Sequence, residues 1–334
     1  METLLALCTL VTLVLTSSGL PFPPLSDAEI DYVNNVAHTT WRAGRNFQQS
    51  QLDMVKHMLG YNWEANDKMH KKFQNRRRVE VRKDLPSQFD PRKKWPNCTS
   101  LGEIRDQANC GSCWAFGAVE TMSDRICIHG GGNVHISADD MLSCCPYCGM
   151  GCEGGYTLMA WMWYVHGGVV TGGQYNSSEG CKTYFLPHCD HHTKGRYKPC
   201  GEVTGKPECV KKCREGYGKD YESDKHRGRE HYHVWDVREI MQELVDRGPV
   251  EASMEVYSDF ISYKSGVYQV TKGASKLGSH AIKILGYGVE NGTEYWNVAN
   301  SWNADWGDRG FFKIRRGHNE CGIESHVITG LPRI

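Results

Sequence analysis

The distribution of cysteine is the feature of this 334-residue sequence that most constrains its fold. The chain has 15 cysteines, and all except Cys8 and Cys321 lie between residues 98 and 213. Cysteine at this density is typical of chains that fold in an oxidising compartment, so we expect disulfides. The alternative is a zinc site formed by two closely spaced cysteine pairs, Cys145 with Cys148 and Cys209 with Cys213.

The N-terminal residues have the composition of a secretory leader. An apolar run from Leu4 to Thr16 is followed by the small residues Ser17-Ser18-Gly19. Because such a run is too short to span a bilayer, it predicts a signal peptide over residues 1–19 and a lysosomal or extracellular product. No later run reaches the roughly 18 apolar residues of a membrane span. The 39 basic and 39 acidic residues balance, so neither nucleic acid nor a membrane is an expected partner.

Residues 20–84 differ in amino-acid composition from the rest of the chain. They contain no cysteine and are rich in lysine and arginine, including the run Arg76-Arg77-Arg78. This stretch could be a small solvated helical domain. It could also be a pro-segment, because an exposed basic run near its end suits proteolytic release.

A buried helix is predicted to begin near residue 113. Ala115, Val119, Met122 and Ile126 recur at spacings of three and four, the pattern of one helical face. Cys113 would lie in the first turn, where free backbone N–H groups and the helix dipole stabilise an anion. A thiol placed there ionises more readily, and the thiolate is nucleophilic. The plainer alternative is a disulfide partner or a small buried hydrophobe.

The last third of the sequence is predicted to form an antiparallel sheet. Asn291-Gly292, between two strand-like runs, is a strong hairpin signal. The runs are residues 250–256, 281–289, 294–299 and 310–315.

One helix precedes these strands. Asp236 and Glu239 fit a capping box at its start, and Gly248-Pro249 ends it. Helices followed by a sheet predict an α+β fold in two lobes. We expect a mostly helical domain over residues 85–228 and a mostly β domain over residues 229–334.

Two residues of the predicted sheet could complete a catalytic site. His280 stands at the entry to a strand, and Asn300 directly follows another. A structural histidine and a turn-capping asparagine are the plainer alternatives. Gly154 and Gly155 precede a short apolar helix, where the lack of side chains would let a bound backbone approach closely.

The motifs around these residues resemble the papain family of cysteine peptidases. Cys110-Gly111-Ser112-Cys113-Trp114 fits the family's nucleophile signature at every position, and Asn300-Ser301-Trp302 is close to its asparagine motif. The resemblance to cathepsin B-like members covers nearly the whole chain, with residues 40–47 similar to their pro-region and residues 85–90 to their mature N-terminus. It implies a pro-segment at residues 20–84. It also implies a papain-like fold, with an active-site cleft between a helical left domain and a β-barrel-like right domain.

The resemblance assigns a role to each candidate catalytic residue. Cys113 would attack the peptide carbonyl as a thiolate, and His280 would protonate the leaving amine. Asn300 would orient the imidazole, Gln107 would donate to the oxyanion, and Trp302 would shield the His–Asn bond. No metal or cofactor is implied. The expected partners are protein and peptide substrates, the chain's own propeptide as inhibitor and cystatin-type inhibitors, and the chain is expected to be a monomer. The rival hypothesis is a catalytically inactive secreted binding protein on the same scaffold, which loss of the nucleophile would mark.

A cysteine-bounded insertion selects a subfamily. His280 and Asn300 follow Cys113 at a greater distance than the roughly 130–150 residues of the papain pattern. Residues 189–200 supply part of the excess and resemble the occluding loop of cathepsin B. The resemblance implies that His191 and His192 bind a substrate's terminal carboxylate, which gives removal of C-terminal dipeptides. A metal-binding or merely solvated histidine pair is the alternative.

The resemblance also implies a disulfide pattern that leaves Cys8, Cys113 and Cys321 unpaired. The implied pairs are Cys98–Cys127, Cys110–Cys152, Cys144–Cys209, Cys145–Cys148, Cys181–Cys213 and Cys189–Cys200.

The substrate pocket departs from the family pattern. His326 stands where cathepsin B carries a glutamate that accepts arginine at the substrate P2 position. An imidazolium repels a guanidinium, so we expect weak cleavage after Arg-Arg and a preference for an apolar or aromatic P2 residue. Ser279 replaces a glycine beside His280, which would crowd the substrate. The expected pocket residues are Tyr156, Thr157, Ser253, Ala281 and His326.

The loop departs from the pattern as well. The resemblance pairs His191 with Asp106 and a loop arginine with Asp305. Here Arg196 lies one position early, with Tyr197 in its place. We therefore expect a loop that opens more readily and favours endopeptidase action.

Three sequons are candidate glycosylation sites, at Asn97, Asn176 and Asn291. The first is the weakest candidate because Cys98 is expected to be paired.

Overall fold

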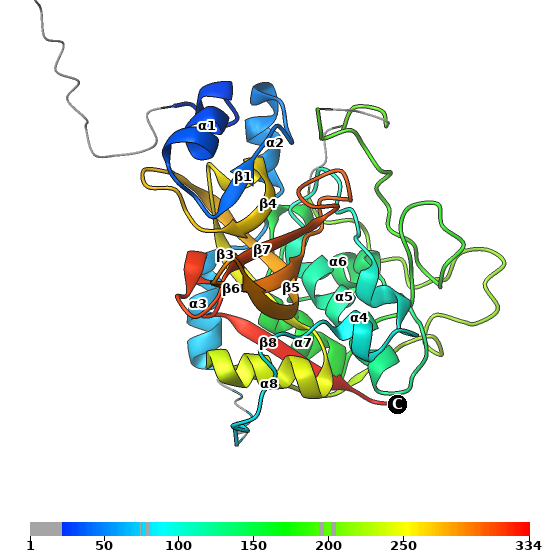
Figure 1. Cartoon of the computed structure of the whole chain (residues 1–334). Helices are drawn as coiled ribbons and strands as arrows, with labels where there is room; N and C mark the ends of the chain where they lie inside the picture. The colour runs from blue at the N-terminus through cyan, green and yellow to red at the C-terminus, as the bar shows by residue number, and fades with distance from the viewer. Residues whose placement is uncertain (1–21, 74, 76, 78–79, 194–196, 202–204) are drawn as a thin grey trace, which may run out of the picture.

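The computed structural model describes residues 22–73, 75, 77, 80–193, 197–201 and 205–334. The predicted pro-segment (called the pro-segment below) lies along one edge of the molecule, above and to the left of the sheet in Figure 1. Ser26 caps its first helix and Asn62 its third, each accepting from a backbone N–H three residues on. Its elements are α1 (Asp27–Asp31), the π-helical turn η1 (Tyr32–Val36), β1 (Trp41–Ala43), η2 (Gln49–Gln51), α2 (Leu52–His57) and α3 (Trp63–Lys72).

The helical lobe is built around α5 (Cys113–Ile128), which begins at the residue predicted from sequence. Its residues from Cys113 to Ile126 are all buried, because α6 and α7 pack on it from one side and β5 and β8 from the other. The other elements of this lobe are α4 (Pro91–Lys94), η3 (Thr99–Gly102), α6 (Ala138–Cys144), η4 (Gly151–Glu153) and α7 (Thr157–His166).

Disulfides replace regular structure between residues 167 and 227, where the described residues form neither helix nor named strand. Cys113 and Cys321 are free and buried. The cysteines considered for a zinc site are all used in disulfides, and the pairing agrees with the one that the resemblance implies. The six pairs are Cys98–Cys127, Cys110–Cys152, Cys144–Cys209, Cys145–Cys148, Cys181–Cys213 and Cys189–Cys200.

The β lobe is an eight-stranded sheet in the order β1-β4-β7-β6-β5-β3-β8-β2. The predicted hairpin joins β5 (Lys276–Glu290) to β6 (Thr293–Ala299), and its turn residues Asn291 and Gly292 have φ values of 50° and 79°. The remaining elements are β2 (Gly228–Val234), α8 (Val237–Arg247), β3 (Val250–Tyr257), η5 (Phe260–Ser262), β4 (Tyr263–Tyr268), β7 (Phe311–Arg315), η6 (Glu320–Gly322) and β8 (Val327–Pro332).

The four predicted strands correspond to β3, β5, β6 and β7, whereas β1, β2, β4 and β8 were not predicted. One pair of named strands also departs from the predicted antiparallel arrangement. β4 and β7 are parallel, which is possible because β5 and β6 lie between them in the chain and provide a long connection. In addition, β1 of the pro-segment pairs with β4 and extends the sheet. The sheet of the β lobe therefore includes a strand of the predicted pro-segment.

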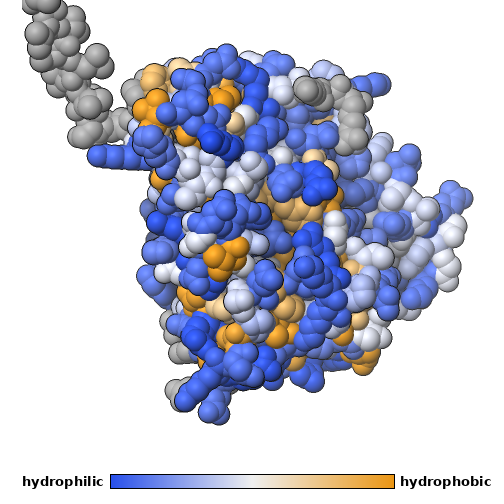
Figure 2. All heavy atoms as spheres, in the orientation of Figure 1, coloured by the Kyte–Doolittle hydropathy of each residue, from blue (hydrophilic) through white to orange (hydrophobic). Residues whose placement is uncertain are grey.

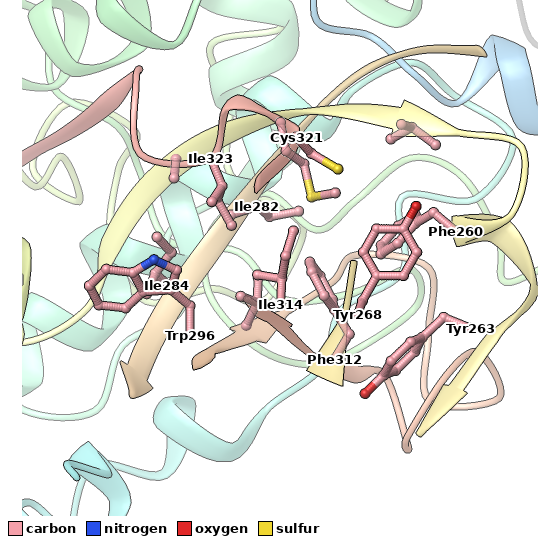
Figure 3. Close-up of a cluster of buried hydrophobic side chains, with 14 of the residues drawn as sticks. Phe260, Tyr263, Tyr268, Ile282, Ile284, Trp296, Phe312, Ile314, Cys321 and Ile323 are labelled. Atoms are coloured by element: carbon pink, nitrogen blue, oxygen red, sulfur yellow. The ribbon is translucent and has the colours of Figure 1, made fainter. Parts of the chain in front are cut away.

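One apolar core unites the pro-segment with the β lobe. Phe260, Tyr268 and Phe312 pack together in its centre (Figure 3), and Trp41 and Phe47 of the pro-segment belong to the same cluster. On the face drawn in Figure 2, hydrophilic side chains predominate and hydrophobic ones form small patches. Among the helices of the described residues, none is long and apolar enough to cross a membrane. The predicted signal peptide, with Cys8, lies outside those residues.

Candidate active site

Cys113 lies at the first position of α5, at the junction of the two lobes, and is fully buried. Burial raises the pKa of its thiol to about 12, although the backbone N–H groups of Ala281, Gly60 and Trp114 favour the thiolate. The sequence predicted a readily ionised thiol at this helix terminus. In this form of the chain burial outweighs the helix terminus and raises the pKa of the thiol instead.

His280 and Asn300 form a hydrogen-bonded pair. His280 Nε2 and Asn300 Oδ1 are 2.8 Å apart, and the ring of Trp302 lies 4.8 Å from that of His280. His280 Nδ1 is buried without a hydrogen-bond partner among the described residues. The next residue along β5, Ala281, is the one whose N–H influences Cys113. Burial lowers the pKa of His280 to about 4, although the hydrogen bond to Asn300 opposes the shift.

Gln107 has its side-chain amide fixed in the cleft. Its Nε2 donates to the carbonyl oxygen of Met58 in the pro-segment at 2.8 Å and to that of Cys110 at 2.7 Å. Its Oε1 accepts from the hydroxyl of Ser301, so the amide orientation is set. An amide donor that already binds a carbonyl oxygen at this place could stabilise an oxyanion there.

The pro-segment crosses the site in an extended conformation at Gly60 and Tyr61. Gly155 N donates to Gly60 O at 3.0 Å, and Tyr61 N donates to Ser279 O at 3.3 Å. A Cβ on Gly60 would overlap the Gly111 carbonyl oxygen, and one on Gly155 would overlap the Trp114 ring. Glycine is therefore required at these close approaches, and a peptide backbone covers the nucleophile.

The side chain of Tyr61 fills the predicted substrate pocket. Its hydroxyl lies 3.0 Å from His326 Nδ1, and its ring belongs to a buried cluster with Cys113 and Ala281. Burial raises the pKa of Tyr61, while Ser253 and Thr157 lie close enough to oppose that shift. The structure thus brings four of the five predicted pocket residues around one aromatic ring. Tyr156 lines the adjoining cavity of about 600 Å³, together with Gly154 and Gly155.

The loop histidines are buried against the pro-segment. His191 Nε2 lies 3.2 Å from Asp106, and His192 Nε2 lies 3.0 Å from the carbonyl oxygen of Trp302. The ring of Phe47 lies 6.2 Å from that of His191 and 5.2 Å from that of His192. The pro-segment therefore covers both. Arg196, the candidate for the second loop contact, lies outside the described residues.

His188 is a site residue that the sequence reasoning missed. Its Nδ1 lies 3.0 Å from Asp106, so that this buried carboxylate faces two histidines. Asn303 Nδ2 also donates to Asp106, at 3.3 Å. Burial opposes ionisation of Asp106, but these hydrogen bonds hold its pKa well below the usual range. The position of His188 directly before Cys189 was the available sequence signal.

A free cysteine at a helix N-terminus, a His–Asn pair and a glutamine amide in one interlobe cleft define a cysteine peptidase of the papain fold. The chain belongs to the papain family: the model for "Papain family cysteine protease" matches residues 85–331, and that for "Peptidase family C1 propeptide" matches residues 25–61. It is a cathepsin B-like cysteine peptidase with its inhibitory propeptide in place, which favours the peptidase over the inactive binding protein.

Curated relatives and one solved structure are similar to this chain and are cathepsin B-like. A cathepsin B-like cysteine proteinase of Schistosoma japonicum is 45% identical over 95% of this chain and 94% of its own length. Cathepsin B-like cysteine proteinase 6 of Caenorhabditis elegans is 52% identical over 75% of this chain and 68% of its own. The solved structure of procathepsin B S9 from Trypanosoma congolense has a TM-score of 0.78 at 34% identity, covering 94% of this chain and all of that one.

Proposed function

We propose that the processed chain hydrolyses peptide bonds through a thioester on Cys113. When the pro-segment leaves, water re-enters the cleft and the dipole of α5 favours the thiolate. The thiol proton passes to His280 Nδ1, the ring nitrogen that the bond to Asn300 leaves available. The observation that carries this proposal is the His280–Asn300 bond, with the residue after His280 in the strand, Ala281, packed against a free cysteine at a helix N-terminus.

The reaction then follows from these positions. The thiolate forms a bond to the carbonyl carbon, and the oxygen takes up the negative charge near Gln107 Nε2. His280 gives its proton to the leaving amine as the C–N bond breaks. Water, deprotonated by His280, attacks the thioester and releases the acid and the thiol.

Hydrolysis of an internally quenched peptide tests these roles. Cys113→Ser is expected to abolish turnover by the processed enzyme. Gln107→Ala is expected to lower kcat about 100- to 1000-fold with little change in KM, because the amide acts on the transition state. Turnover by Cys113→Ser at the wild-type rate would refute the proposal.

We also propose that the processed enzyme removes C-terminal dipeptides in addition to cutting internally. His191 and His192 support this, because the pro-segment residue that covers them, Phe47, departs on processing. Imidazole N–H groups at that place can donate hydrogen bonds to a terminal carboxylate. Dipeptide release from a peptide with a free C-terminus is compared with release from its amide, and equal rates would contradict the proposal.

The substrate pocket is proposed to favour an aromatic P2 residue over arginine. Tyr61 supports this, because its ring lies in the pocket with its hydroxyl on His326. A guanidinium would meet an imidazole there and no carboxylate among the proposed lining residues. Equal cleavage of Arg-Arg and Phe-Arg reporter peptides would refute this preference.

The setting of the enzyme is proposed to be the lysosome or the extracellular space, reached through the secretory pathway. Six disulfides are consistent with that route. The sequon residues Asn97, Asn176 and Asn291 are exposed and accessible to glycosylation. A monomer inhibited by cystatin-type proteins is part of the same proposal; sedimentation and inhibitor titration of the processed enzyme test it.

A further inference from the structure

A cluster of three histidines joins the pro-segment to the mature enzyme behind the substrate pocket. His70 lies on α3, His233 on β2, and His326 directly before β8. His70 Nδ1 and His233 Nε2 are 2.5 Å apart, and the rings of His70 and His326 stack at 4.7 Å and 12°. Their exposed fractions are 2%, 2% and 5%. An added proton is therefore placed where water cannot solvate it.

The hydrogen bonding of the cluster suits neutral rings. His70 Nδ1 and His233 Nε2 face each other, and only one hydrogen atom fits between them, on one of the two nitrogens. His70 Nε2 is buried without a partner among the described residues, whereas the backbone of Asn75 lies close enough to His233 to favour its protonated form. A further proton on His70 Nε2 therefore lacks an acceptor, and a second proton between the two rings sets two N–H groups face to face.

The carboxylate of Asp67 faces the cluster closely, but it interacts with a lysine as well as with a histidine of the cluster. Asp67 on α3 lies 3.3 Å from His326 Nε2 but also 2.6 Å from Lys71 Nζ. On β2 the neighbouring titratable group is His231, another imidazole, which lowers the pKa of His233. Asp67 thus makes a proton on His326 less unfavourable in the docked state. Lys71 and His231 make protonation of the cluster more unfavourable.

The other charged groups around the adjoining cavity of about 500 Å³ have their own partners. The carboxylate of Glu324 accepts from Trp296 Nε1 and from the backbone N–H groups of Gly317 and Asn319. Asp236 caps α8. On the pocket side, the group that meets His326 is the phenol of Tyr61.

Desolvation and these neighbours set the direction of the pH effect. Burial, followed by His233 and His326, lowers the pKa of His70 to about 2. Burial also lowers the pKa of His233 to about 4, although the backbone of Asn75 opposes that shift, and it lowers the pKa of His326. When docking of the pro-segment lowers the pKa of a histidine, acid favours the released form, in which that histidine keeps its ordinary pKa near 6.5. Below that pH, docking weakens about tenfold for each pH unit. His70 alone then weakens docking about 100-fold between pH 6.5 and 4.5.

The cluster is connected directly to the segment that blocks the nucleophile. α3 begins two residues after Tyr61, and the ring of Trp63 stacks on His326 at 4.4 Å. Release of α3 from β2 and His326 would thus free Gly60 and Tyr61 from the cleft. We propose that His70, His233 and His326 form an acid-sensitive latch that keeps the pro-segment in the cleft at neutral pH and releases it in acid. The latch depends on the zymogen form and not on the dipeptidase or P2 proposals.

Two substitutions keep the hydrogen bond and remove the charge. Asn at position 70 places its amide where His70 has Nδ1, and Gln at position 233 places its amide where His233 has Nε2. His70→Asn with His233→Gln is therefore the test variant. His38→Gln, at an exposed pro-segment histidine, is the matched control. Asp67→Asn has the opposite expected effect, because it removes the carboxylate that supports a charged His326.

The assay is covalent labelling of Cys113 by a small epoxide inhibitor in the full zymogen, read on the uncleaved band. Each rate is divided by that of the processed enzyme at the same pH, which cancels the titration of the catalytic dyad. In the wild type this ratio is expected to rise at least 100-fold from pH 7 to 4.5. It should rise at least tenfold less in the double variant and more in Asp67→Asn, with His38→Gln unchanged. A double variant that follows the wild-type curve, or an Asp67→Asn zymogen that opens no more readily in acid, overturns the latch.

Discussion

Gly60 of the pro-segment is the residue whose enlargement by one methyl group should break latency. Its position leaves no room for a Cβ, which would overlap the carbonyl oxygen and carbon of Gly111. These are backbone atoms, and the Cys110–Cys152 disulfide anchors the residue beside Gly111. The backbone around Gly111 cannot move to make room for the added methyl group. The pro-segment must therefore move out of the cleft at Gly60.

The cost can be worked out from the contacts that withdrawal loosens. Three hydrogen bonds hold the pro-segment here: Gly155 N to Gly60 O, Tyr61 N to Ser279 O, and Gln107 Nε2 to Met58 O. At about 1 kcal/mol each, their loss weakens docking by about 3 kcal/mol, or roughly 100-fold.

The assay is epoxide labelling of the intact Gly60→Ala zymogen at pH 7, normalised to the processed enzyme. Gly44→Ala is the matched control, because a Cβ there meets only the flexible side chain of Lys264, at 2.7 Å. Labelling is expected to rise about 100-fold in Gly60→Ala and less than threefold in Gly44→Ala. If both variants remain as latent as the wild type, the pro-segment does not block the cleft at Gly60.

Three further predictions concern specificity, the loop and the thiol. His326→Glu should raise kcat/KM for an Arg-Arg reporter relative to Phe-Arg by about 10- to 100-fold, the value of a charge-assisted bond, and an unchanged ratio would count against the pocket assignment. His188→Leu removes one of two histidines from Asp106, so dipeptide release should fall relative to internal cleavage; a constant ratio of the two rates would exclude a role for His188 in the loop. Because burial raises the pKa of Cys113 to about 12 in the zymogen, iodoacetamide labelling should climb about tenfold per unit from pH 8 to 10. A plateau in the zymogen below pH 9 would contradict that burial.

Regular elements with a strong local pattern were predictable from the sequence. The apolar spacing from Ala115 to Ile126 gave α5, and Asn291-Gly292 gave the hairpin between β5 and β6, because both signals lie within one element. β1 is only three residues long and pairs with β4 across more than 200 residues of sequence, and such long-range pairing leaves no local pattern.

The charge state of the site was less predictable than its residues. The position of Cys113 at a helix terminus predicted an acidic thiol, yet in the zymogen burial outweighs the helix dipole. That outcome depends on Gly60 and Tyr61, which carry no catalytic signature of their own. Likewise, His70, His233 and His326 are far apart in sequence, and only the fold brings them together.

The central claim is that Cys113 is the nucleophile and that the pro-segment masks it. The most direct measurement is peptide mapping by mass spectrometry after reaction with a peptidyl vinyl sulfone, before and after removal of the pro-segment at pH 7. The expected result is one adduct, on Cys113, that forms rapidly in the processed enzyme and at least 100-fold more slowly in the zymogen. An adduct on Cys321 instead, or equal rates in the two forms, would contradict the account.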